Sequence, residues 1–526
     1  MTSTFHSIET AKRSLFTQTA ALNTTGHNVA NANTEGYSRQ VVKMEATRPL
    51  EAFGMTHSTF PGQLGTGVEV TSIERVREKY LDTQYRNENA DLGNYTIQKD
   101  SLDKLQAIFN EPSDTGIRTV VDNFYKAWSD LSKDPESVTA RTIVKESALA
   151  LTDAMNHMSK QLSDLSTDLT TNIATKGTEI QTYLTAISNL NQSITKIESS
   201  GDKANDLRDQ RDLLTDKLSK IVNINVTDSD QGYNISIGGQ ALVTGFTVAA
   251  AQVDGAFLTG AFASGDLKGG EVYGMIVSRD NYVADYTNQL NSMANTLANG
   301  DINIKLPKGS VIPDGTTVRL PDGTTKQFTG SVAARTLGSD LNVVVAGLNG
   351  LHQLGYTKEG QGANGKPITG LPFFTASDNG TITASNITLN AAIADDPTKI
   401  ATSLRVSDTE NLVQGNNTIA SLISNLKTTA FTTPGTTKSA TIDSYFSSMV
   451  GQLGIQAQEA DRLTDNSTSL VSQVETMRQS VSGVSLDEEM SNMIKFQHAY
   501  SAASRFMTTF DQLLDKLINS TGTVGR

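Results

Sequence analysis

The two ends of this chain carry apolar residues at helical spacing, but the apolar stripes are thin. Near the N-terminus the steps are three, four or seven residues, which places the apolar side chains on one face of a helix: Phe5, Ile8, Ala11, Leu15, Leu22 and Val29. So sparse a stripe cannot stabilise a helix alone, because packing rather than propensity holds most helices together. The N-terminal helix therefore needs a partner.

The last fifty residues offer that partner. Their apolar positions form a near-heptad seam typical of a coiled coil: Leu486, Met490, Met493, Tyr500, Ala503, Met507, Phe510, Leu514 and Leu517. We therefore predict that the two ends pair as a coiled-coil layer. The predicted packing residues are Phe5, Ile8, Leu15 and Leu22 on the first helix, and Phe496, Tyr500, Phe506, Met507, Phe510, Leu514 and Leu517 on the last.

A turn motif follows the N-terminal stripe. Residues 28–39 read Asn-Val-Ala-Asn-Ala-Asn-Thr-Glu-Gly-Tyr-Ser-Arg. Asparagine tolerates the left-handed conformation that ends helices, and Gly36 supplies a positive φ at little steric cost. The string therefore predicts a helix stop and a tight turn, followed by an extended segment from Tyr37. For the asparagines alone, an ordinary helix cap and loop is the competing interpretation.

The whole string resembles the N-terminal signature of the flagellar axial proteins, which comprise the rod, hook and hook-associated families. Members carry an Ala-Asn-x-Asn-Thr-x-Gly-Tyr core, and residues 30–37 supply it here. Many members have proline where Glu35 stands, so the turn depends on Gly36. The resemblance implies that the string is an assembly motif, with the site residues Asn28, Asn31, Asn33, Thr34, Gly36, Tyr37 and Arg39.

The C-terminal stretch 483–500 carries a second signature. Ser485 and Glu488 have the spacing of a capping box, which predicts that a helix begins at Leu486. The stretch resembles the ending of the hook-associated branch of the axial proteins, and hook and rod proteins usually differ from it around Phe496. The two signatures cover only the ends of the chain.

The resemblance implies a structural subunit of the bacterial flagellum that joins hook to filament and is not an enzyme. Its implied partners are further copies of itself in a tubular ring, the flagellar hook protein, hook-associated protein 3, and an export chaperone bound at the C-terminal helix. Export through the type III apparatus, without a cleaved signal peptide, would place it in the extracellular flagellum. A hook-type axial subunit is the alternative, and an enzyme that uses a small β insertion at about 301–342 as a catalytic or glycan-binding module is a more distant rival.

Net charge, cysteine content and hydropathy exclude several classes of partner and of chemistry. The formal net charge of −13 argues against nucleic acid as a partner. The chain has no cysteine, so neither disulfides nor thiol chemistry is available. No run of about eighteen apolar residues occurs, so no membrane partner is expected. The first residues also lack the basic region and apolar core of a signal peptide.

Periodicity predicts a mainly α fold with an inserted β region, elongated and built from nested discontinuous domains. Helical spacing begins near Ile73, a short helix covers 205–221, and strands start with a hairpin at 223–237. Two Pro-Asp-Gly turns suggest a small β insertion at about 301–342. The predicted domains are 1–60 with 486–526 (terminal coiled coil), 61–222 with 411–485 (helical bundle), and 223–410 (β-rich middle).

Three patterns resemble ligand-binding or metal-binding motifs, but each lacks a residue or spacing that the motif requires. Residues 360–366 fit a phosphate-loop pattern, but Pro367 replaces the required hydroxyl residue and no helix follows. Asp228 and Asp230 open like a calcium loop, yet Gly239 stands where the bidentate acid is needed. The six histidines show no close ligand pair. We therefore expect no catalytic residue, cofactor or metal.

Overall fold

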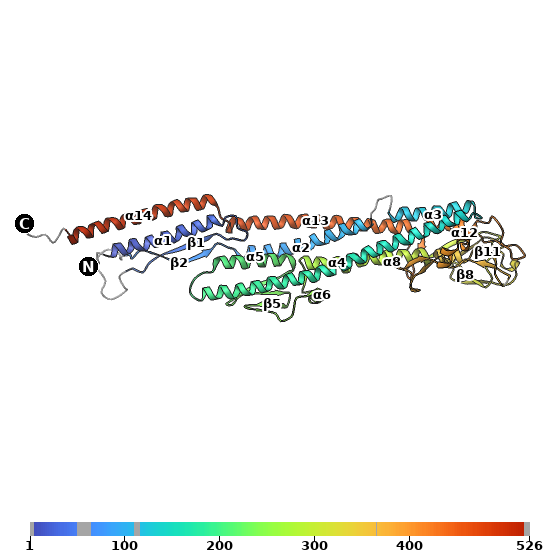
Figure 1. Cartoon of the computed structure of the whole chain (residues 1–526), viewed down its shortest axis with the longest axis horizontal. Coiled ribbons are helices and arrows are strands. Elements are labelled where there is room, and N and C mark those ends of the chain that lie inside the picture. Colours follow the sequence, from blue (N-terminus) through green and yellow to red (C-terminus); the bar gives the residue numbers. More distant parts are fainter. Residues whose placement is uncertain (1–4, 50–64, 110–115, 364, 520–526) are drawn as a thin grey trace, which may run out of the picture. The chain divides into compact units, whose positions relative to one another are not determined.

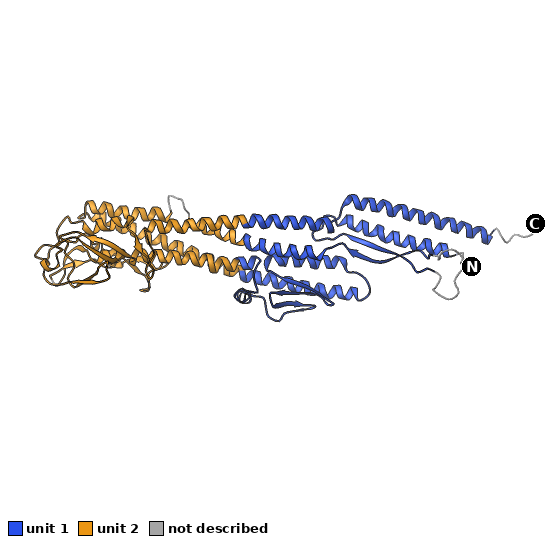
Figure 2. Ribbon diagram, turned by 180° about the vertical axis from the view of Figure 1, so that it is seen from behind, with its two compact units in different colours: residues 1–96, 173–274, 463–526 blue, residues 97–172, 275–462 orange. Residues whose placement is uncertain are grey.

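The computed structural model describes residues 5–49, 65–109, 116–363 and 365–519. The chain divides into two compact units, each assembled from separate stretches of sequence (Figure 2). Unit 1 comprises residues 1–96, 173–274 and 463–526, and unit 2 comprises residues 97–172 and 275–462. The predicted division into three nested domains is finer than these two units and stays a prediction.

In unit 1 the two ends of the chain lie side by side (Figure 1). Helix α1 (His6–Ala30) contacts α14 (Leu486–Asn519) and also the antiparallel strands β1 (Gln40–Ala46) and β2 (Val68–Arg75). The buried face of α1 is small and polar, which lets its neighbours approach closely: Ala11, Thr17, Ala21, Thr24, Thr25 and Asn28.

The expected helix start at Ile73 is wrong. Ile73 lies in β2 and pairs with Val42 of β1, and helix α2 (Lys79–Phe109) begins six residues later, at Lys79. In the first half of β2, from Val68 to Thr71, the residues alternate between less and more exposed positions, as in a strand with one covered face. Ile73 and Val76 are three residues apart, which is helical and not strand spacing, so their periodicity placed the helix start too early.

The rest of unit 1 combines helix α5 (Asn205–Ile221) with parts of α2, α4 (Val138–Glu198) and α13 (Ile442–Ser482). The bounds of α5 match the sequence prediction. A four-stranded antiparallel sheet in the order β3-β4-β5-β6 follows α5. Its strands are Asn225–Ser229, Gly232–Ile237, Gln240–Thr244 and Thr247–Val248, and α6 spans Gly255–Ser264. The predicted hairpin is therefore present.

Unit 2 has a helical part with an aromatic core. Its elements include α3 (Ile117–Lys133), the π-helix η1 (Ser278–Val283), α8 (Ala284–Asn299), α10 (Gly347–Gln353) and α12 (Thr418–Asn425). Helix α7 (Glu271–Val277) begins in unit 1 and enters unit 2 at Met275. The ring of Trp128 packs 5.5 Å from that of Phe373 and 6.4 Å from that of His352, measured between centroids. Trp128, Phe373 and His352 are completely buried.

Unit 2 also contains a six-stranded sheet in the order β16-β15-β7-β10-β8-β9. The strands are β7 (Asp301–Leu306), β8 (Thr316–Arg319), β9 (Thr325–Phe328), β10 (Leu341–Ala346), β15 (Phe431–Thr432) and β16 (Ser439–Ala440). Gly315 and Gly323 of the two Pro-Asp-Gly turns have φ values of 81° and 85°. The sheet reaches beyond 301–342, because Phe431 pairs with Ile302.

Short elements complete unit 2. They are α9 (Val332–Arg335), β11 (Tyr356–Gln361), β12 (Pro367–Thr369), β13 (Phe374–Ala376), β14 (Ile387–Leu389), α11 (Ala391–Asp395) and the 3-10 turns Pro397–Lys399 and Leu426–Thr428. The phosphate-loop look-alike begins at the end of β11, and its residue 364 lies outside the described residues; Lys366, the lysine of the pattern, pairs with Asp314. Within the described ranges, no helix has the length and hydropathy needed to cross a bilayer.

Candidate assembly site at the N-terminal turn

The turn after α1 is held by hydrogen bonds among its own polar residues. The Asn31 side chain donates to the His27 carbonyl at 3.0 Å, and Thr34 Oγ1 donates to Asn31 Oδ1 at 3.2 Å. The Tyr37 N–H then donates to the Thr34 carbonyl at 3.2 Å, which closes the turn. The predicted helix stop and turn are thus present. Asn31 caps the helix with a φ of −101°, so it is not left-handed as the sequence suggested.

Gly36 is the residue that needs a left-handed backbone. Its φ is +78°, and a Cβ placed on it would lie 3.0 Å from Cβ of Leu213 in α5. Both observations favour glycine, because other residues rarely adopt this conformation and a side chain would displace the turn from α5. Gly36 therefore brings the turn into close contact with the helix beneath it.

Asn28, in the last turn of α1, uses the full hydrogen-bonding capacity of its side-chain amide. Its Oδ1 accepts from the Gln40 N–H at 3.0 Å and from the Tyr37 hydroxyl at 2.8 Å. Its Nδ2 donates to the Gln40 carbonyl at 2.9 Å and to Glu489 Oε2 at 3.1 Å. Asn28 is 1% exposed, so each of these bonds satisfies a group that water cannot reach.

Polar contacts join the turn to the start of α14. Besides the bond from Asn28 to the buried Glu489, Arg39 contacts Glu488 at 2.6 Å. The Arg39 N–H also donates to the carbonyl of Ser482, the last residue of α13, at 2.8 Å. The Glu488 N–H approaches Ser485 Oγ at 3.5 Å, which is one half of the predicted capping box, whereas the Glu488 carboxylate contacts Arg39. Sequence reasoning named Asn28 and Arg39 but missed their carboxylate partners, which stand hundreds of residues away.

Tyr37 acts as a hydrogen-bond donor in this arrangement. Burial raises the pKa of its hydroxyl well above the usual range, and the charges of Asp206, Asp209 and Glu489 raise it further. The hydroxyl therefore stays protonated and donates to Asn28. The ring also packs edge-on against His27, with the centroids 5.6 Å apart.

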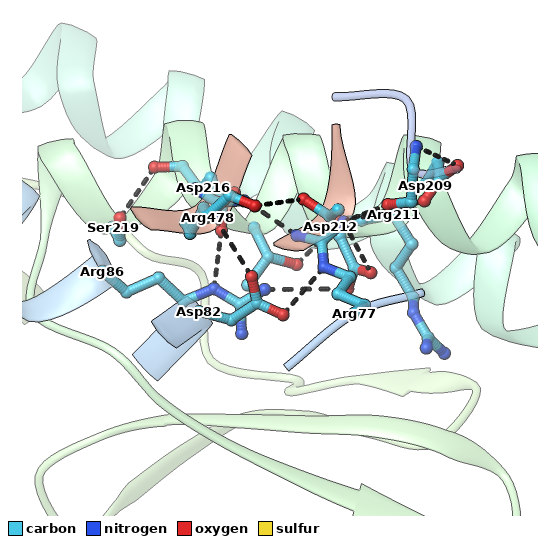
Figure 3. A network of polar contacts seen from close by, with 12 residues as sticks. Arg77, Asp82, Arg86, Asp209, Arg211, Asp212, Asp216, Ser219 and Arg478 are labelled. Carbon is cyan, nitrogen blue, oxygen red and sulfur yellow. Dashed lines mark hydrogen bonds and ion pairs between the residues drawn. The ribbon is translucent and has the colours of Figure 1, made fainter. Parts of the chain in front are cut away.

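A buried ion-pair network lies beneath the turn (Figure 3). The Ser38 N–H connects the turn to it by donating to Asp209 Oδ2 at 3.0 Å. Arg75 contacts Asp209 at 2.6 Å and Asp212 at 2.9 Å, and Arg77 contacts Asp82 at 2.8 Å. The aspartates at 209 and 212 come from α5, and Asp82 comes from α2.

Arg478 brings the end of α13 into the same network. Its guanidinium contacts Asp216 at 2.8 Å and Asp82 at 3.2 Å, and it lies 4.3 Å from the centre of the Tyr85 ring. Burial alone would raise the pKa of Asp212, but Arg77, Arg75 and Arg86 hold it well below its usual range. Asp212 is therefore charged, and removal of one of its cations would leave a buried charge unpaired.

The predicted packing residues are only partly covered in the single chain. Those with exposed side chains are Phe5, Tyr500, Phe506 and Leu517, whereas Ile8, Leu15, Leu22, Phe496, Met507, Phe510 and Leu514 are half-buried. Further exposed apolar residues lie along α14: Leu486, Met490, Ile494, Leu513 and Ile518. So much exposed apolar surface on one helix is typical of an interaction site. Asn33 and Thr34, at the tip of the turn, are also exposed.

The titratable side chains near the turn can be compared with the arrangements that hold metal ions. No group of three or more His, Asp or Glu side chains among the described residues is arranged to hold a metal ion. The titratable groups gathered near the turn are arginines and aspartates that neutralise one another, and the nearest histidine, His27, contacts Asp206 at 3.3 Å. The arrangement connects chain segments and presents apolar surface.

Family-level comparisons match three stretches of the chain. Residues 102–304 match the family described as "Flagellar hook-associated protein FlgK helical domain". Residues 8–37 match "Flagella basal body rod protein", and residues 470–520 match "Flagellar basal body rod FlgEFG protein C-terminal". The last two stretches contain the turn and α14, which the structure brings together.

Full-length relatives and a solved structure agree with these matches. The chain is 34% identical to flagellar hook-associated protein 1 of Bacillus subtilis (strain 168), with 100% of both chains covered. It is 24% identical to flagellar hook-associated protein 1 of Escherichia coli (strain K12), covering 97% of this chain and 99% of the relative. The flagellar hook junction protein FlgK from Burkholderia pseudomallei has a similar fold, with a TM-score of 0.52 at 14% identity over 76% of this chain and 100% of that one.

Proposed function

The chain belongs to the flagellar hook-associated protein 1 family, and from this membership we propose that it is the structural subunit that joins hook to filament in the extracellular bacterial flagellum. One observation supports this function most directly. The turn at residues 28–39 is hydrogen-bonded to the first turn of α14, so both ends of the chain form one assembly element.

We propose that α1 and α14 work as a coiled-coil pair within a tubular ring of subunits. The buried face of α1 is small and hydroxyl-rich, so the pair buries little apolar surface by itself. Ordering of both helices would then depend on packing against neighbouring copies, which is folding coupled to binding. The exposed apolar side chains of Phe5, Tyr500, Phe506 and Leu517 would take part in that packing.

Proposed partners follow from the position of a hook–filament junction. The flagellar hook protein would lie on one side of the ring and hook-associated protein 3 on the other. Before assembly, an export chaperone would cover the C-terminal part of α14, holding Met507, Phe510, Leu514 and Leu517 in a groove. Leu517 is 56% exposed and needs such cover during type III export, which we propose proceeds without a cleaved signal peptide.

We propose that the protein acts by assembly and not by catalysis, within the three nested domains predicted from the sequence. The rival enzyme hypothesis rests on the β region of unit 2. It is tested by replacing the β8–β9 hairpin, residues 316–328, with a short linker, which is feasible because the Gly315 N–H already donates to the Phe328 carbonyl at 2.9 Å. Loss of a chemical activity, with assembly intact, would favour the rival.

Deletion of the gene tests the proposed function. We expect intact hooks without filaments by electron microscopy, with flagellin released into the medium. Filaments of normal length in the deletion strain would contradict the proposal. Polymerisation of the purified protein into long curved tubes would instead favour a hook-type subunit.

A further inference from the structure

Arg211 differs from the other arginines of the buried network in unit 1. It is 2% exposed, yet none of the carboxylates in the described ranges forms an ion pair with it. Its Nη1 donates to Asn191 Oδ1 at 3.0 Å, and its guanidinium carbon lies 3.5 Å from the centre of the Tyr233 ring. In Figure 3 its side chain extends away from the aspartates.

No carboxylate therefore contacts Arg211 directly, although the charge of Asp212 acts on it from a greater distance. Its Nε is buried and has no hydrogen-bond partner among the described residues. A buried guanidinium is costly unless a counter-charge or acceptors surround it. Contact with the Tyr233 ring compensates part of that cost, since the ring face is electron-rich.

A cavity of about 260 Å³ lies at this position. Ten charged side chains line it, six cationic and four carboxylate, and the six cations are Arg75, Arg77, Lys79, Lys203, Arg208 and Arg211. The four carboxylates, of Glu74, Asp82, Asp212 and Asp228, each contact a cation other than Arg211 or Lys203. Arg208 is likewise paired, with Glu198 at 2.6 Å. The cavity therefore has two cations in excess, Arg211 at its wall and the exposed Lys203.

Arg141 in unit 2 provides an instructive contrast. It is also buried, at 1% exposure, without a carboxylate partner in the described part of the chain. Its two terminal nitrogens instead donate to the carbonyls of Ile400 and Pro135 and to Thr402 Oγ1. These three acceptors belong to separate chain segments, which Arg141 fastens together. Arg211 has fewer acceptors and an adjoining cavity that could supply one.

We propose that this cavity binds a small oxyanion or carboxylate, which Arg211 and Lys203 hold between them. Two-oxygen acceptors suit a guanidinium because its parallel N–H groups can donate to both oxygens. The cavity is too small for a drug-sized ligand but accommodates a sulfate, a phosphate or the end of an acidic side chain. The anion comes either from solution or from an Asp or Glu side chain of a second copy of this chain.

Sulfate titration of the purified full-length protein tests the solution source and does not depend on the proposed function. At constant ionic strength we expect one saturable site by calorimetry. Arg211→Gln should weaken it about tenfold or more, because a charge-assisted contact is lost. Lys203→Gln should weaken it about threefold without affecting folding, since Lys203 is exposed.

Arg462→Gln is the matched control, because Arg462 is exposed and pairs with Glu459 on its own helix. It removes the same charge and should leave sulfate affinity unchanged. Saturable binding that resists both Arg211→Gln and Lys203→Gln would overturn the proposal. Arg211→Gln could lose affinity through partial unfolding. Lys203→Gln keeps the test valid in that case, provided that the circular dichroism spectrum of Lys203→Gln matches that of the parent.

If the monomer shows no saturable sulfate binding, the next test is whether an Asp or Glu side chain of a neighbouring copy supplies the anion. Lys203→Gln should then reduce incorporation into flagella in a complemented deletion strain, whereas Arg462→Gln should not. Such a result would assign the anion to a neighbouring copy. If sulfate does not bind and Lys203→Gln is incorporated normally, the cavity is not an anion site. Filament formation with and without the parent protein is measured in the same strain. If the proposed function is wrong, the parent makes no difference to filament formation, which distinguishes that outcome from a failure of the anion site.

Discussion

The side-chain amide of Asn28 donates a hydrogen bond to the carboxylate of Glu489 at 3.1 Å, although 461 positions separate the two residues in the sequence. Both are almost completely buried, with 1% and 3% of their surface exposed. A buried polar pair in a helix–helix contact specifies register, because any other alignment leaves both groups unsatisfied. Asn28 and Glu489 therefore fix how α1 and α14 align.

Asn28→Asp should prevent incorporation into the flagellum. The substitution replaces a donor with a carboxylate that faces Glu489, which leaves buried like charges and an unsatisfied Gln40 carbonyl, at a cost of at least about 3 kcal/mol. Asn466→Asp is the matched control, because Asn466 is exposed on α13 and lies outside the assembly motif. The measurement is the number of filaments per cell in a complemented deletion strain, with secreted protein as the check on export.

The double variant Asn28→Asp with Glu489→Gln refines this test. The introduced glutamine amide would be able to donate to the new carboxylate, so pairing is partly restored and incorporation should recover in part. A double variant no better than Asn28→Asp alone would show that the contact between the two side chains does not set the register.

Gly36→Val should leave the inner helices folded and abolish incorporation. A valine at φ +78° is strained, and its Cβ would lie 3.0 Å from Cβ of Leu213. Gly26→Ala is the control: Gly26 lies within α1, and a Cβ added there would meet nothing within 4 Å beyond the backbone of the helix itself, so alanine should be neutral or stabilising. Circular dichroism reports the helices and motility in soft agar reports incorporation. Normal motility of Gly36→Val would contradict the role of the turn.

Arg478→Met should lower the free energy of unfolding by about 3–5 kcal/mol, because Asp82 and Asp216 lose a cation in a buried network. Arg462→Met provides the comparison on the same helix. The side chain of Arg462 is 65% exposed and pairs with Glu459, so its loss should cost no more than about 1 kcal/mol. Urea denaturation measures both. Equal midpoints for the two variants would mean that the network adds no stability.

Acid should destabilise unit 2 through His352. The Ala401 N–H donates to Nε2 at 2.8 Å, so the neutral ring carries its proton on Nδ1, which donates to the Leu371 carbonyl at 2.5 Å. Burial lowers the pKa of His352 to about 4, and the charge of Arg141 acts in the same direction. The folded pKa lies below the unfolded value of about 6.5, so the unfolded state binds the proton first as pH falls.

The contribution of neutral His352 to the free energy of unfolding is therefore fully present above pH about 6.5. It falls by about 3 kcal/mol in total as the pH is lowered toward about 4. Urea midpoints at pH 7 and pH 4 measure it. Between pH 7 and pH 4 the free energy of unfolding of the parent should fall by about 3 kcal/mol more than that of His352→Gln. His157 is exposed, so His157→Gln should show the same pH dependence as the parent. Identical pH dependence in His352→Gln and the parent would rule out this titration.

Local signals in the sequence predicted local structure well. The bounds of α5, the β3–β4 hairpin and the turn at Gly36 follow from spacing and turn chemistry that act within a few residues. The start of α2 was misplaced because the step of three from Ile73 to Val76 is helical, whereas pairing with Val42 of β1, which spacing does not reveal, makes Ile73 part of a strand. Glu489 and the ion-pair network were missed for a different reason. Their members come from segments far apart in the chain, and a carboxylate on an amphipathic helix looks solvated until its partner is placed.

The strand order of the six-stranded sheet in unit 2 determines where a peptide can be inserted without disrupting the fold. Excising 301–342 would remove β7, the strand on which Phe431 pairs, and so would dismantle the sheet from its middle. The tip of the β8–β9 hairpin at Asp322 and Gly323 is exposed and belongs to an edge strand pair. An epitope or fluorophore-binding peptide inserted there would label the junction in living cells while the strands beneath it keep their partners.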